Sequence, residues 1–155
     1  MATLNVNRVL VPTDFSEASQ VALEYAVALA EAFEASLHLL HVVERLPSDV
    51  WQASSAVPAG LYEEVEKGAR EGVNRLLTEQ QRTRLRVQSA VQAGKPFLEI
   101  IRYARDHDID LIVMGTHGRG PVVQVLMGSV AEKVVRKAPC PVLTEIGRAS
   151  CRERV

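Results

Sequence analysis

The stretch DLIVMGTHGRG, residues 110–120, places the most apolar run of the chain directly before a glycine-rich segment. A short, uninterrupted apolar run is typical of a strand that lies inside a parallel sheet and is buried on both faces. The glycines interrupt this strand and open a loop at its carboxyl end. These residues therefore predict a buried parallel strand followed by a loop at the sheet edge where ligands bind in such folds.

Four further segments of the chain are predicted to be strands. They comprise residues 7–12, 36–43, 84–91 and 141–144. Three of them are apolar runs like the first, whereas residues 84–91 alternate polar and apolar side chains, a pattern typical of a half-exposed strand at a sheet edge.

Helices are predicted between these strands, four in all. The first is capped by Ser16, the second covers residues 60–81, the third covers residues 96–106, and the last opens at Gly128 and Ser129. Regular alternation with short connections implies βαβ units with right-handed crossovers. The predicted fold is α/β: a single doubly wound, five-stranded parallel sheet with helices on both faces.

The composition limits the classes of protein. A chain of 155 residues, 47% apolar and 24% charged, suits one domain, predicted at residues 1–145. No apolar run has the roughly 20 residues of a membrane span, and the first residues lack a signal-peptide pattern, so a cytoplasmic protein is expected. The net charge of −1 is scattered, which disfavours nucleic-acid and membrane binding and favours small-molecule and protein partners.

The last ten residues, IGRASCRERV (146–155), follow the final predicted strand without any helix or strand periodicity. They resemble the translation of a widely used sequencing-adapter oligonucleotide. Two interpretations stay open: a non-native extension of the gene sequence, or a genuine disordered C-terminal tail. Resequencing the native gene across codon 145 separates them, and in either case the segment is excluded from the fold.

Two loops are predicted to form a ligand site, because ligands of doubly wound sheets bind beyond the carboxyl ends of the strands. One is Pro12-Thr13-Asp14 and the other is residues 115–120. Gly115 and Gly118, with Gly128-Ser129 after nine intervening residues, would let backbone amides approach an anion beside a helix N-terminus. The arrangement suits a nucleotide, with ribose hydroxyls near the Asp14 carboxylate.

In this arrangement the chain resembles the universal stress protein family over residues 7–144. The matching segments are VPTDFS (11–16), LHV (40–42), GTHGRG (115–120), GSVAEKV (128–134) and PCPVL (139–143). The resemblance implies strand order 3-2-1-4-5, a Rossmann-like fold of the adenine nucleotide alpha hydrolase type, and ATP, with or without Mg²⁺, bound through the intact G-x2-G-x9-G-S motif.

The resemblance also implies adenine contacts near Val42, ribose contacts near Asp14 and phosphate contacts at the glycines. The predicted nucleotide-binding residues are Pro12, Thr13, Asp14, Val42, Met114, Gly115, His117, Gly118, Arg119, Gly128, Ser129 and Val130. No catalytic or metal-ligating residue is predicted. The final strand, Pro141, Val142, Leu143 and Thr144, would be the seam of a homodimer.

Structural interpretations of the same residues stay open. Isolated glycines often make only turns, Asp14 could be only a cap or turn residue, and His117 alone in a glycine loop is more typical of packing than of chemistry. His38 and His41 belong to a predicted strand and are interpreted as structural.

Three functions are weighed for the chain. The first is an ATP-binding regulatory homodimer in stress response, with slow hydrolysis at most. The second is a dimeric interaction module of the same fold with weak or no nucleotide binding. A nucleotide-cleaving enzyme is disfavoured, because no general base is evident near the glycine loop and neither G-x-x-x-x-G-K-[ST] nor G-x-S-x-G occurs.

Overall fold

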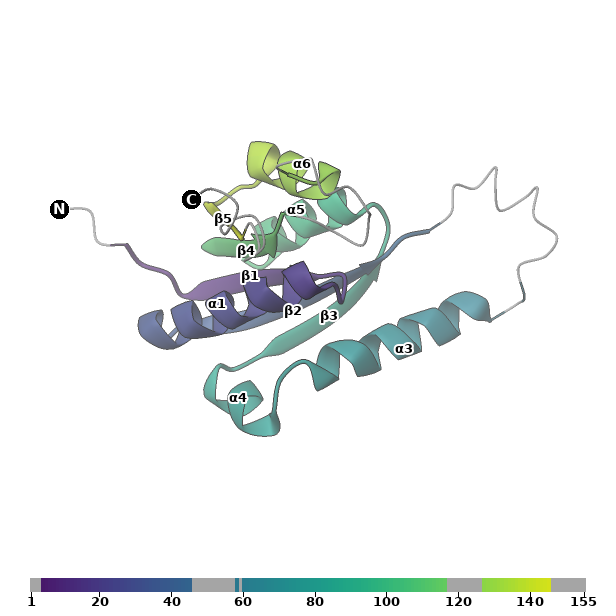
Figure 1. The fold of residues 1–155 in the computed structure, drawn as a ribbon, viewed down its shortest axis with the longest axis horizontal. Helices are drawn as coiled ribbons and strands as arrows, with labels where there is room; N and C mark the ends of the chain where they lie inside the picture. The colour runs from purple at the N-terminus through teal and green to yellow at the C-terminus, as the bar shows by residue number, and fades with distance from the viewer. Residues whose placement is uncertain (1–3, 46–57, 59, 117–126, 146–155) are drawn as a thin grey trace, which may run out of the picture.

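The computed structural model describes residues 4–45, 58, 60–116 and 127–145, in which five parallel strands form one sheet (Figure 1). The strands are β1 (Arg8–Thr13), β2 (Ser36–Val43), β3 (Gln88–Ala93), β4 (Leu111–Gly115) and β5 (Val142–Glu145). Their order, β3-β2-β1-β4-β5, confirms the predicted topology. All four neighbouring pairs run parallel, so the carboxyl ends of the strands share one edge of the sheet.

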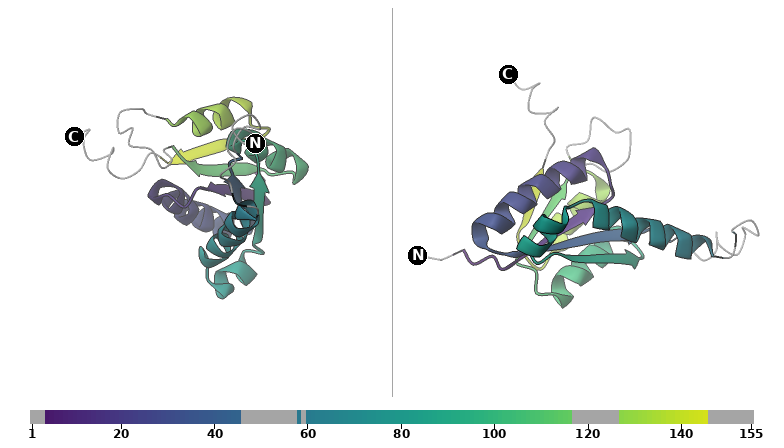
Figure 2. Two further views of the ribbon diagram at one scale, coloured as in Figure 1. Left: turned by 90° about the vertical axis from the view of Figure 1, so that its right-hand side faces the viewer. Right: turned by 90° about the horizontal axis from the view of Figure 1, so that it is seen from below.

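Helices cover both faces of the sheet, as the alternation of elements predicts (Figures 1 and 2). One face packs against α1 (Glu17–Phe33) and α3 (Leu61–Arg75), with the short α4 (Glu79–Arg84) after α3. The other face packs against α5 (Pro96–Asp106) and α6 (Ser129–Lys137). The fold is therefore a three-layer α/β sandwich.

The three inner strands β1, β2 and β4 are largely apolar, as expected of strands that are buried on both faces. In β1, Val9 and Val11 pack toward α1, while Leu10 between them packs toward α5 and α6. In β4, Val113 likewise packs on the side of α1, and Ile112 packs on the side of α5 and α6. Continuous apolar runs in the sequence thus correspond to two separate cores, one on each side of the sheet.

The start of α1 follows the predicted cap. Ser16 has an extended backbone, and its side chain accepts a hydrogen bond from the Ser19 amide at 3.2 Å. This bond satisfies one of the amides that the first turn of a helix leaves without a partner. The cap directs the chain away from β1 within a few residues, which keeps Asp14 close to the strand end.

The predicted helix over residues 60–81 is wrong in extent. In the structure α3 ends at Arg75, and a separate helix, α4, covers Glu79–Arg84, so the described residues contain five helices. Thr78 and Gln81 form a capping box: the Thr78 side chain accepts from the Gln81 amide, and the Gln81 side chain accepts from the Thr78 amide. A reciprocal pair of this kind starts a new helix and interrupts the old one.

The predicted strand over residues 84–91 is shifted toward the C-terminus. Arg84 ends α4, Arg86 adopts a left-handed backbone with φ of 47°, and β3 starts at Gln88. The alternation nevertheless identified the buried side, because Leu85, Val87 and Val91 all pack into the core beneath α1 and α3. The predicted edge position of this strand is confirmed.

In the part of the chain that the structure describes, no helix is both long enough and apolar enough to cross a membrane.

Candidate functional site

A pocket of about 850 Å³ lies at the carboxyl ends of β1, β2 and β4. From β1 the chain passes to α1 on one face of the sheet, whereas β4 is followed by α6 on the other. The two connections diverge and leave a crevice between adjacent strands, which is where ligands bind in doubly wound folds. The volume lies within the range that small-molecule sites usually occupy.

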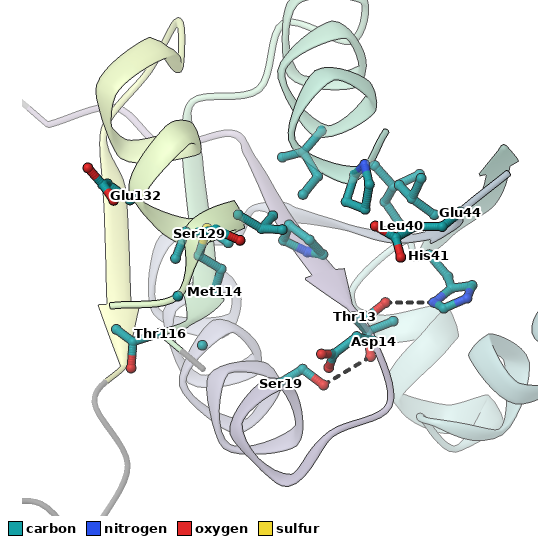
Figure 3. A pocket seen from close by; sticks show the side chains of 18 of the residues that line it. Thr13, Asp14, Ser19, Leu40, His41, Glu44, Met114, Thr116, Ser129 and Glu132 are labelled. Carbon is teal, nitrogen blue, oxygen red and sulfur yellow. Dashed lines mark hydrogen bonds between the residues drawn. The ribbon is translucent and has the colours of Figure 1, made fainter. Parts of the chain in front are cut away.

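The two ends of the pocket differ in chemistry (Figure 3). Toward β2 and α5 the wall is mainly apolar, with Leu40, Val42, Pro96 and Ile100, and its polar side chains are His41 and Glu44. Toward β4 and α6 the wall contains Gly115, Gly128 and Ser129. An elongated ligand with one flat apolar end and one anionic end would match this division.

The loop after β1 is held by hydrogen bonds that leave part of Asp14 available. The Thr13 hydroxyl accepts from the Phe15 amide at 3.1 Å and shares a hydrogen bond of 3.2 Å with the Ser19 hydroxyl. Asp14 Oδ1 accepts from the Ser16 amide at 2.9 Å, so Asp14 does act as a turn residue. Because Asp14 also lines the pocket, its other carboxylate oxygen can accept from a ligand hydroxyl.

The first turn of α6 contributes to the opposite end of the pocket. Gly128 is the N-cap of this helix and makes no side-chain capping bond. Ser129, Val130 and Ala131, the first residues of α6, all line the pocket. Uncapped amides and the positive end of the helix dipole form a favourable environment for phosphate oxygens.

A sequence model of the Universal stress protein family matches residues 5–144. The chain belongs to the universal stress protein family.

Relatives support the same assignment. Universal stress protein MJ0577 of Methanocaldococcus jannaschii is 32% identical over 151 residues, covering 88% of this chain and 92% of the relative. Universal stress protein YxiE of Bacillus subtilis is 31% identical and covers 88% of this chain and 97% of its own length.

Solved structures agree with the fold. The structure of hypothetical protein MJ0577 superposes with a TM-score of 0.70 at 30% identity, over 90% of this chain and 95% of the other. Universal stress protein UspA from Lactobacillus plantarum gives a TM-score of 0.64 at 29% identity, over 92% of this chain and 99% of the other.

This universal stress protein brings most of its predicted nucleotide-binding residues to one pocket. Nine of the predicted residues line the pocket: Pro12, Thr13, Asp14, Val42, Met114, Gly115, Gly128, Ser129 and Val130. The other three, His117, Gly118 and Arg119, lie outside the described residues. Whether the nine contact a nucleotide stays a prediction.

Several lining residues were not identified from the sequence. His41, interpreted as structural, lines the pocket and also donates from Nδ1 to the Thr13 carbonyl oxygen at 2.7 Å. Val65 reaches the pocket from α3, and Ile100 from α5. No local motif marks the latter two, because their place depends on how the helices pack on the sheet.

Gly115 has a structural role in addition to its place in the pocket. A Cβ atom at this position would lie 2.9 Å from the Ala18 carbonyl carbon and 3.0 Å from the Ala18 carbonyl oxygen. These are backbone atoms of α1, which cannot move aside as a flexible side chain could. The glycine therefore permits the close approach of β4 to the start of α1.

We expect Gly115→Ala to lower the free energy of unfolding by about 1–3 kcal/mol, the usual cost of overpacking. Urea denaturation measures it. Gly68→Ala is the matched control, because a Cβ atom there meets nothing within 4 Å; in α3 it should instead stabilise the protein slightly. Equal stability of Gly115→Ala and the parent protein would contradict the close approach.

Proposed function

We propose that this universal stress protein binds ATP in the pocket at the carboxyl ends of β1, β2 and β4. The observation that carries the proposal is the convergence of an apolar wall, a partly free carboxylate and an uncapped helix start on one pocket. These three features complement the base, the ribose and the phosphates of a nucleotide, in that order along the pocket. The intact glycine motif of the sequence supports the same ligand.

In the proposed pose the adenine lies against Val42 at the apolar end. The ribose hydroxyls donate to Asp14, and the phosphates lie beside Gly128 and accept hydrogen bonds from the backbone amides of Ser129 and Val130 at the start of α6. Gly115, and Gly118 outside the described residues, would complete the phosphate contacts. Mg²⁺ would accompany the phosphates as their counterion, with phosphate oxygens among its ligands.

One neighbour of this fold is a universal stress protein solved in complex with cAMP, with a TM-score of 0.65 at 22% identity over 92% of this chain. At that identity the likeness concerns the fold. ATP binding by this chain therefore rests on its own pocket and glycine motif.

We propose nucleotide binding, with slow hydrolysis at most, as the basis of a regulatory function in stress response. Three carboxylates line the described part of the pocket, and two of them have partners: Asp14 accepts from the Ser16 amide, and Glu132 pairs with Arg136 at 3.0 Å. The third, Glu44, lies beside Leu40, away from the start of α6 where the phosphates are placed (Figure 3). A carboxylate held in this way is a weaker candidate for a general base. Bound ATP would then act by favouring one conformation of the protein over another.

We further propose that residues 1–145 form one nucleotide-binding domain that dimerises through its final strand. β5 is an edge strand of the sheet, and Leu143 within it is 43% exposed. Edge strands with exposed apolar side chains readily pair with a second chain. If ATP binding fails, a dimeric interaction module of the same fold is the remaining candidate.

Isothermal titration of the nucleotide-free protein with ATP and Mg²⁺ tests the proposal. We expect saturable binding near one ATP per chain. A version ending at Glu145 should bind equally, because the lining residues that the structure describes all precede Glu145. Folded, nucleotide-free protein that takes up no ATP would reject the proposal in favour of the interaction module.

A further inference from the structure

Phe15 adopts a backbone conformation that is unusual for its residue type. Its φ is 62°, in the left-handed region that bulky side chains rarely enter. The Phe15 amide donates to the Thr13 hydroxyl at 3.1 Å, so the conformation belongs to the hydrogen-bonded loop that also presents Asp14. Strain of this kind persists only where surrounding contacts hold it, and it gathers at functional sites.

The Phe15 ring is held between β2 and α3. On one side it packs against the His41 ring, with centroids 4.6 Å apart and planes inclined by 34°. His41 is itself fixed by its hydrogen bond to the Thr13 carbonyl oxygen, seen in Figure 3. The tip of the same ring lies close to Gly72 of α3, where an added Cβ atom would be 3.0 Å from Phe15 Cζ.

The same helix reaches the nucleotide pocket. Val65 of α3 lines the pocket and is 43% exposed. It lies seven residues before Gly72, which puts the two positions on the same side of the helix. Ala69 and Val73, between and beside them, are buried and anchor α3 on the sheet. A shift of α3 at Gly72 would therefore move both the Phe15 ring and Val65 in the pocket wall.

We propose that Phe15 is a positioning residue of the nucleotide site and that its contact with Gly72 couples α3 to the pocket. The inference rests on the proposed ATP binding. The Phe15 ring contacts both His41 and α3. These contacts stabilise the left-handed backbone of Phe15 and, with it, the loop that directs Asp14 into the pocket. By reciprocity, a ligand that stabilises this loop also stabilises the docked position of α3.

A matched pair of substitutions in α3 tests the coupling. Gly72→Leu would force the Phe15 ring and the helix apart, whereas at Gly68, one turn earlier, an added Cβ atom meets nothing within 4 Å. Both substitutions exchange glycine for a good helix former, so both gain helix propensity. We expect Gly72→Leu to weaken ATP binding about tenfold, within the usual range of couplings between sites, and Gly68→Leu to leave the affinity unchanged.

A spectroscopic readout separates positioning from a general loss of structure. In amide NMR spectra, Gly72→Leu should shift the resonances of Asp14, Phe15 and Ser16, and Gly68→Leu should leave them in place. If Gly72→Leu does not fold, Phe15→Leu replaces it, since loss of the ring should weaken ATP binding while unfolding stays cooperative.

The outcomes are distinct. Absence of ATP binding in the parent and in Gly68→Leu alike would reject the nucleotide site itself, and the positioning role with it. Tight binding by the parent together with equal affinity in folded Gly72→Leu, or in Phe15→Leu where that variant replaces it, would leave the nucleotide site standing and overturn the role of Phe15.

Discussion

Gly128→Val is expected to weaken ATP binding by about two orders of magnitude while the protein stays folded. Gly128 has φ of −69° and ψ of 158°, an ordinary extended conformation that valine adopts without strain. Its amide still donates to the Thr116 carbonyl oxygen, because that bond involves only the backbone. The new side chain would instead occupy pocket space where the phosphates should approach. A steric conflict of about 3 kcal/mol corresponds to a loss of affinity of about 100-fold.

Titration with ATP measures this loss, and thermal unfolding checks that the variant keeps its structure. Gly68→Val serves as the control, because it makes the same substitution on α3 in open space. If Gly128→Val bound ATP as tightly as the parent, the assignment of the phosphate end of the pocket to the start of α6 would be wrong.

The second large effect concerns His38, which is buried on the opposite face of β2 from His41. His38 is 2% exposed, and its Nδ1 shares a hydrogen bond of 2.9 Å with the Tyr103 hydroxyl. Burial, aided by the nearby charges of His107 and Arg8, lowers the pKa of His38 from 6.5 to about 4. Burial likewise raises the pKa of Tyr103, so its hydroxyl remains protonated.

Lowering the pH from 7 to 4 should therefore destabilise the fold by about 3 kcal/mol through His38 alone, since each pKa unit corresponds to about 1.4 kcal/mol. The unfolded chain takes up the proton near pH 6.5, whereas the native protein resists until about pH 4. The stability that neutral His38 contributes is therefore fully present above pH 6.5 and is lost as the pH falls from 6.5 to about 4. Below about pH 4 both states are protonated, and this contribution changes no further.

Urea denaturation at several pH values between 7 and 4 measures the effect. His38→Gln keeps a polar partner for Tyr103 but cannot be protonated in this range, so its stability should fall less steeply with acid. Equal pH slopes in the parent and in His38→Gln would show that His38 titrates normally in the fold.

Much of the architecture was predictable because its signals are local. β2 and α5 have the boundaries that the sequence predicts, since both are strongly periodic or apolar and α5 begins at Pro96. The break between α3 and α4 was missed although Thr78 and Gln81 form a local capping signal. The amphipathic pattern concealed it, because Leu76 and Leu77 continue the apolar side of α3 beyond its last residue and pack into the same core.

The sequence alone determined the family, because the segments that carry the resemblance are short and local. The order of strands was implied by that resemblance, and the structure confirms it. A ligand site at the carboxyl edge of the sheet stays a prediction. Only the tertiary structure decided that Gly115 must lack a side chain to meet α1, that His41 supports the site, and that Phe15 packs against Gly72. Each of these depends on contacts between elements distant in the chain. Which side chains meet in these contacts depends on how the helices pack on the sheet, and no local sequence pattern specifies that packing.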